Sequence, residues 1–244
     1  MESIDMENTL SLNSEVGYQL PREIILRAIG YQNPDSAGEE INDLITEYLG
    51  LAIIAADPKA IYRSTSFRLV GDDQVELLDG QILTSEMLYQ TIAECEGIII
   101  GLVTLGSKTD AAIAAVSQED AFCGYLTDVI SSLLVEILAH KFWQYLVSEL
   151  GSQGYRATSF VSPGAIKFPL PEQKRIFQFL QPERIGVTLT ESCLMEPSKS
   201  LTVILGYGKQ IEPAKYSHDC STCDMKDCLI RGIHIDLAES NAGY

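Results

Sequence analysis

The residues best suited to bind a metal lie near the C-terminus of this 244-residue chain, where three of its six cysteines fall close together. Cys220, Cys223 and Cys228 form a C-x2-C-x4-C pattern. A gap of two residues lets two thiolates of one tight turn point at the same ion. Iron–sulfur clusters usually take four thiolates, so the fourth ligand would be Cys193, His218 or none, with one iron position open. The pattern predicts an iron–sulfur cluster or zinc at this tail, and the alternative is three unmodified thiols.

Other ionisable residues fall within an apolar segment, residues 119–150. Asp128 and Glu136 are eight residues apart, which places them on roughly one face of a helix. Because a buried acid needs a partner, we expect internal ion pairs at these two positions rather than a cleft. His140 lies near Trp143, and we expect a core or surface histidine there rather than a ligand. The chain has no Gly-x-Ser-x-Gly, P-loop or dinucleotide-binding motif, so nothing supports a stand-alone hydrolase or kinase.

Helical and strand patterns are mixed along the chain without a regular βαβ rhythm. Apolar spacing and capping residues predict helices at residues 21–30, 36–56, 87–95, 109–116 and 119–150. Alternation and β-branched runs predict strands at about residues 60–70, 75–78, 97–106, 187–190 and 201–205. This order predicts an α+β fold, with a mixed, mainly antiparallel sheet packed with helices.

Two segments are expected to form the core of this fold. Residues 97–106 are the most apolar run and are bounded by glycines, which is typical of a central strand. Apolar residues cover much of the circumference of the helix at 119–150, so it should be long and largely buried. We divide the chain into a flexible lead-in (1–18), one domain (19–212) and a cysteine-rich tail (213–244).

The stretch 162–208 carries an ordered set of motifs. A Pro163-Gly164 turn is followed by a short helix that Pro171 opens, then by Leu-Thr-Glu-Ser at 189–192. Met195, Pro197 and Ser200 come next, before the strand at 201–205. This order over about 45 residues resembles the activation domain of cobalamin-dependent methionine synthase.

The resemblance implies a ligand and a set of contacts. Domains of that family bind S-adenosylmethionine, and the turn Ser162-Pro163-Gly164 would lie against it, because glycine lets a ligand approach the backbone closely. Glu191 would contact the amino or sulfonium group, or accept backbone hydrogen bonds. The family usually has arginine four residues before this glycine and tyrosine after it, whereas Phe160 and Ala165 stand here. Arg156 is the nearest arginine that could substitute.

The resemblance also implies a function. The family domain caps the corrinoid of methionine synthase and allows oxidised cob(II)alamin to be reduced and remethylated. The expectation is an accessory protein that acts in trans on a corrinoid-binding methyltransferase subunit, with cobalamin held by that partner and an electron-transfer protein as a further partner. The alternative is an iron–sulfur or zinc redox subunit on the same scaffold that no longer binds S-adenosylmethionine. A third alternative is a purely structural partner subunit.

Charge and composition limit the partners and the cellular compartment that we expect for this protein. The formal net charge is −17, with no basic run, so nucleic acid and anionic membranes are not expected as partners. The N-terminal residues are acidic and polar rather than basic and then apolar, and the apolar runs look too short or too interrupted to cross a bilayer. We therefore expect a cytoplasmic protein, in which the cysteines are thiols or metal ligands rather than disulfides.

Overall fold

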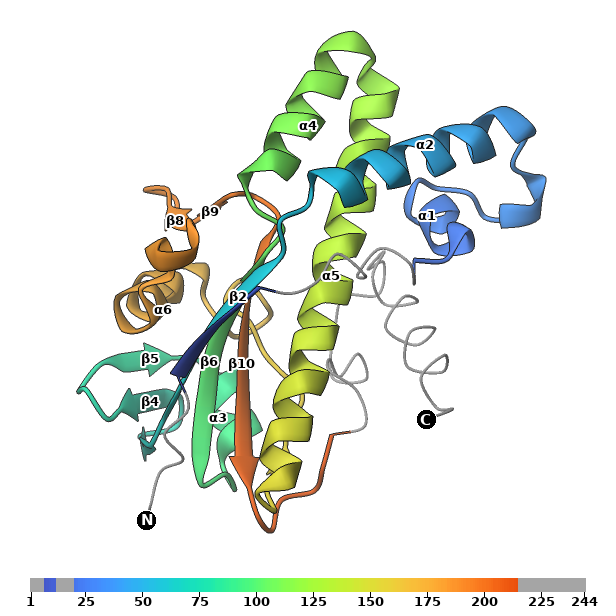
Figure 1. Ribbon diagram of the computed structural model, residues 1–244. Helices are drawn as coiled ribbons and strands as arrows, with labels where there is room; N and C mark the ends of the chain where they lie inside the picture. The colour runs from blue at the N-terminus through green and yellow to red at the C-terminus, as the bar shows by residue number, and fades with distance from the viewer. Residues whose placement is uncertain (1–6, 12–19, 215–244) are drawn as a thin grey trace.

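The computed structural model in Figure 1 describes residues 7–11 and 20–214. Its centre is a five-stranded antiparallel sheet in the order β1-β2-β6-β10-β7. The strands are β1 (Glu7–Ser11), β2 (Lys59–Thr65), β6 (Gly97–Thr104), β10 (Ser200–Gly208) and β7 (Arg156–Ala157). The sheet is packed with helices on both faces, so the predicted α+β class is confirmed.

The middle strand β6 is the apolar run that the sequence predicted as central. Every one of its residues is buried, and it pairs with β2 on one side and β10 on the other. At Gly101 a side chain would not fit, because a Cβ there would lie 2.8 Å from Phe142 Cε1. The glycine therefore lets the long helix α5 (Ala121–Ser152) lie close against the sheet.

The predicted long, buried helix is also confirmed. The Asp120 side chain caps α5 by accepting a hydrogen bond from the Cys123 amide at 2.8 Å. Against it lie α1 (Arg22–Ala28) and α2 (Glu39–Ala55), which share one apolar core with α5 and the sheet face beneath. The helix α4 (Ser107–Glu119) packs against the N-terminal half of α5 and against α2, beyond the end of the sheet (Figure 1). The helix is long and apolar enough to cross a bilayer, contrary to our expectation for the apolar runs. Most of its apolar window is nevertheless buried against these elements, which makes it a core helix.

The opposite face of the sheet is covered by α3 (Glu86–Ile92) and α6 (Gln173–Leu180). Ser85 caps α3, since its hydroxyl accepts from the Leu88 amide at 2.9 Å. Two small sheets flank this side. The strands β3 (Phe67–Val70), β4 (Gln74–Leu77) and β5 (Ile82–Thr84) form one, and β8 (Thr188–Leu189) and β9 (Met195–Glu196) form the other.

Within the expected lead-in, residues 7–11 form β1, which pairs with β2 along its whole length. Two other local predictions were wrong. The helix predicted from residue 36 begins at Glu39, because Ser36 donates its hydroxyl to the Asn33 carbonyl and Gly38 precedes the helix. The expected strand at 60–70 is two strands that belong to different sheets, interrupted at Ser66. These differences have two causes. One is pairing with a strand from elsewhere in the chain, and the other is a local hydrogen bond that competes with the helix start.

Candidate functional site

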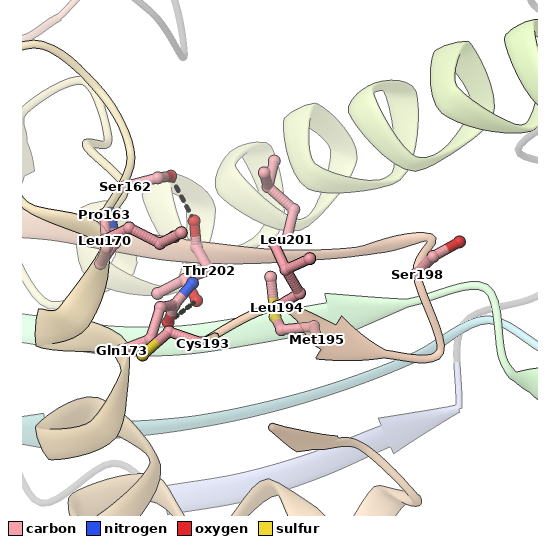
Figure 2. Close-up of a pocket in the computed structure, with 10 residues that line it drawn as sticks. All are labelled: Ser162, Pro163, Leu170, Gln173, Cys193, Leu194, Met195, Ser198, Leu201 and Thr202. Atoms are coloured by element: carbon pink, nitrogen blue, oxygen red, sulfur yellow. Dashed lines mark hydrogen bonds between the residues drawn. The ribbon is translucent and has the colours of Figure 1, made fainter. Parts of the chain in front are cut away.

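A pocket of about 250 Å³ opens at the edge of β10, where the sequence had placed a ligand-binding turn (Figure 2). Three segments contribute to it: the turn at 162–163, the start of α6 and the β8–β9 hairpin with the loop that follows. The lining residues are Ser162, Pro163, Leu170, Gln173, Cys193, Leu194, Met195, Ser198, Leu201 and Thr202. None of these side chains carries a charge. The site is therefore suited to a small, largely neutral group.

The turn holds its shape through internal hydrogen bonds. The Ser162 hydroxyl donates to the Thr202 carbonyl, which fastens the turn to the edge of β10. Gly164 has a φ of +95°, a conformation that favours glycine, and its amide donates to the Phe168 carbonyl at 2.8 Å. This glycine is thus required by the backbone, and its amide is engaged within the chain rather than directed at a ligand.

The wall formed by α6 centres on Gln173, which is 2% exposed. Its side-chain oxygen accepts a hydrogen bond from the Thr202 hydroxyl at 2.9 Å. The sequence analysis did not select Gln173, and no local signal marks it, because it faces β10 only once α6 has packed on the sheet. Figure 2 shows its amide beside Thr202 and Cys193.

The third wall is the tight loop between β8 and β9. Thr190 organises it, since its amide donates to the Leu194 carbonyl at 2.9 Å and its hydroxyl accepts from the Leu194 amide at 3.0 Å. Cys193 is buried with a φ of +66° and belongs to the lining, and its thiol lies 4.0 Å from the Glu191 carbonyl oxygen. Glu191 is exposed and does not belong to the lining, so the structure leaves this predicted ligand contact on the outer surface of the hairpin.

Arg156 does not lie at the turn. It pairs with Gly208 at the opposite end of β10, six residues from Thr202, which corresponds to about 20 Å along a strand. Its guanidinium donates to the Ile211 carbonyl at 3.1 Å. The position where the family has arginine is occupied by Phe160, which is 3% exposed and packs into the α5 core. The suggested replacement of the family arginine by Arg156 is therefore not supported by this geometry.

A buried lysine beside the pocket was also missed. Lys199 is 8% exposed, and its ammonium donates to Asp128 at 2.7 Å and to the Ser132 hydroxyl at 2.9 Å. This confirms an ion pair for Asp128 and ties the turn before β10 to α5. Farther along the same helix, burial raises the pKa of Glu136 to about 7.

The predicted metal ligands Cys220, Cys223 and Cys228 lie outside the described residues, as does His218. Among the residues that are described, no group of three or more histidine, cysteine or acidic side chains is arranged to hold a metal. His140 is buried, its ring lies 5.9 Å from that of Trp143, and burial lowers its pKa. It is a core residue, which is one of the two environments that the sequence analysis left open.

No protein-family model matches this chain, and no curated protein sequence matches it. Its fold does match a solved structure described as the crystal structure of the MetH reactivation domain bound to AdoHcy. The TM-score is 0.65 at 16% sequence identity, and the match covers 85% of this chain and 80% of that one. The chain therefore has the fold of that reactivation domain. The sequence resemblance concerned a few motifs between residues 163 and 200, whereas the similarity in fold covers most of the chain.

Proposed function

We propose that this protein is an accessory factor for the reductive reactivation of a corrinoid-dependent methyltransferase, of which methionine synthase is the model. In this proposal it acts in trans, the partner subunit holds the cobalamin, and an electron-transfer protein supplies the electron. Both partners would be cytoplasmic, like the protein itself. The observation that carries the proposal is the fold shared with the MetH reactivation domain over 85% of the chain.

Two versions of this function differ in whether the site binds S-adenosylmethionine. S-adenosylmethionine carries a sulfonium, an ammonium and a carboxylate. The turn at Ser162, Pro163 and Gly164 would lie against it by analogy, yet the pocket has no charged lining residue, and Glu191 and Arg156 stand outside it. Its volume of about 250 Å³ is also below the roughly 300–1,000 Å³ typical of pockets for drug-sized ligands. These features favour an accessory factor in which S-adenosylmethionine is not tightly held.

We accordingly expect S-adenosylmethionine to bind weakly or not at all. Phe160 and Ala165 replace the charged and phenolic side chains of the family, and one lost charge-assisted hydrogen bond costs about 1.5–3 kcal/mol, or roughly tenfold to a hundredfold in affinity. Isothermal titration calorimetry with the full chain measures this directly. Low-micromolar binding would contradict the prediction and return the site to the ligand of the reactivation domain.

The proposed function is tested with a methionine synthase that lacks its own reactivation domain. Its cobalamin is oxidised to the cob(II) state, and a reductant and a methyl donor are added with and without this chain. We expect the chain to accelerate the loss of the cob(II)alamin absorption band and the return of methylcobalamin, in proportion to its concentration. An isolated MetH reactivation domain is the positive control. Rates that are equal with and without the chain, while the control is active, would refute the proposal.

The second candidate function rests on a different observation, the C-x2-C-x4-C spacing of Cys220, Cys223 and Cys228. In this version the tail holds an iron–sulfur cluster or zinc, and the protein is a redox or structural subunit on the same scaffold. A cluster would also fit the first function, because it could deliver the electron that reduces cob(II)alamin. Metal and sulfide analysis distinguishes a cluster, a zinc ion and unmodified thiols in the tail, and the cob(II)alamin assay distinguishes the two functions.

A further inference from the structure

The pocket contains a buried polar group whose hydrogen-bonding capacity is not used within the described chain. Gln173 is 2% exposed, and its one hydrogen bond is the one that its carbonyl oxygen accepts from Thr202. Its amide nitrogen, which carries two donor hydrogens, has no partner among residues 7–11 and 20–214. This nitrogen is open to solvent at the pocket, so water can satisfy it in the empty site, and an acceptor oxygen of a ligand can take the place of that water.

The strand edge adds a second donor. The carbonyl of Thr202 points at this edge, because it accepts the hydrogen bond from the Ser162 hydroxyl. In an antiparallel ladder the N–H and C=O of one residue point to the same side, so the Thr202 N–H also faces this edge rather than β6. The bonds between Ile204 and Val161 show the same alternation two residues farther on. Two donors on one side of the pocket suit an oxygen with two lone pairs.

The remaining walls of the pocket determine which kind of ligand can carry that acceptor oxygen. Pro163, Leu170, Leu194, Met195 and Leu201 make most of the lining apolar. Ser198, the other hydroxyl at the rim, is already engaged, because its hydroxyl and amide bind the Asp110 carboxylate at 2.8 and 2.7 Å. Inside the rim the lining residues are uncharged, so a cation or an anion held there would lose water without meeting an opposite charge in the lining.

We propose that this pocket binds a neutral group in which a carbonyl oxygen, as in an amide or ester, stands at the end of a short apolar chain. Gln173 donates to the oxygen, and the apolar walls cover the chain. A volume of about 250 Å³ corresponds to about eight water-sized groups, which sets the size of the group. The inference rests on the chemistry of the pocket and holds whether or not the protein reactivates a corrinoid enzyme.

Three probes of equal chain length test the proposal: hexanamide, hexanoate and hexylammonium, each titrated at pH 7 into the full chain. The readout is the methyl resonance of Met195 in protein labelled with 13C-methyl methionine, assigned with Met195→Leu. There are five methionines, so the spectrum is simple and the other four report non-specific effects. We expect hexanamide to shift the Met195 signal with a dissociation constant on the order of 1 mM, and the two charged probes to bind at least tenfold more weakly.

Gln173→Glu replaces the donor nitrogen by an acceptor oxygen and leaves the shape unchanged. It should weaken hexanamide binding at least tenfold and improve the relative binding of hexylammonium. Gln178→Glu, an exposed position on the same helix, makes the same change outside the pocket and should leave all three titrations unchanged. Circular dichroism and thermal melting establish that both variants fold.

If Gln173→Glu does not fold, Leu194→Trp serves instead, because Leu194 lines the rim and is 58% exposed. The larger side chain should reduce hexanamide binding at least tenfold, whereas Leu78→Trp at an exposed site outside the lining should not. The proposal is wrong if the three probes bind equally, if hexylammonium binds the native chain best, or if the substitution inside the pocket and its control act alike. None of these results bears on the cob(II)alamin assay.

Discussion

Replacing Leu133 by alanine should lower the free energy of unfolding by about 2–5 kcal/mol, as is usual when a buried leucine is truncated. Leu133 lies in the middle of α5, is 3% exposed, and belongs to the main apolar core between that helix and the sheet. Truncation removes apolar contacts and leaves a cavity that the rigid surroundings fill only in part. For a chain of this size the melting temperature should fall by about 5–15 °C.

Urea unfolding monitored by circular dichroism checks this expectation. The midpoint should move to a lower concentration while the slope of the transition stays the same. Leu78→Ala is the matched control, because the same atoms are removed from a side chain that is 75% exposed, and it should change stability by about 0.5 kcal/mol or less. Equal midpoints for the Leu133 variant and the native protein would show that α5 is peripheral to the stability of the fold.

Substituting Cys223 by serine should abolish metal binding by the tail or reduce it severely. If Cys220, Cys223 and Cys228 hold a cluster or an ion, each supplies a thiolate, and a serine hydroxyl is a poor replacement for a soft sulfur ligand. Three thiolates beside Asp219 and its acidic neighbours would also repel one another without a cation, so the thiols should be protonated when metal is absent. Metal binding should therefore release protons.

The experiment compares iron, zinc and acid-labile sulfide in the native chain and the Cys223→Ser variant, both prepared without oxygen. Cys95→Ser is the control, because burial beside Glu94 and Glu96 raises the pKa of the Cys95 thiol to about 12 and keeps it protonated. Its metal content should match that of the native chain. Equal metal in the native and Cys223→Ser proteins would remove the tail from the site. Zinc without sulfide would make the site structural and leave electron delivery to the partner.

The sequence was sufficient for features that depend on neighbours along the chain. The apolar run at 97–106 predicted the central strand β6, and the apolar circumference of residues 119–150 predicted the buried helix α5. The helix predicted at residues 87–95 and the strand predicted at 75–78 also correspond to α3 and β4. Helical and strand periodicity, caps and turns are set within a few residues, so a single sequence contains what is needed to predict them. The motifs at 163–200 added a resemblance whose fold is confirmed.

Contacts between segments that are distant in the sequence were decided by the tertiary structure alone. It brought Gln173 to Thr202, separated by 29 positions, and Lys199 to Asp128, separated by 71. It also placed Arg156 at the far end of β10, although Arg156 is close to the turn in sequence. The order of strands in a sheet determines which side chains meet. A strand can pair with the next strand in the sequence or with one that is distant in the sequence. An extended strand rises about 3.4 Å per residue, so a few residues are enough to separate Arg156 from the pocket. Gln173 reaches the pocket because α6 packs on the sheet.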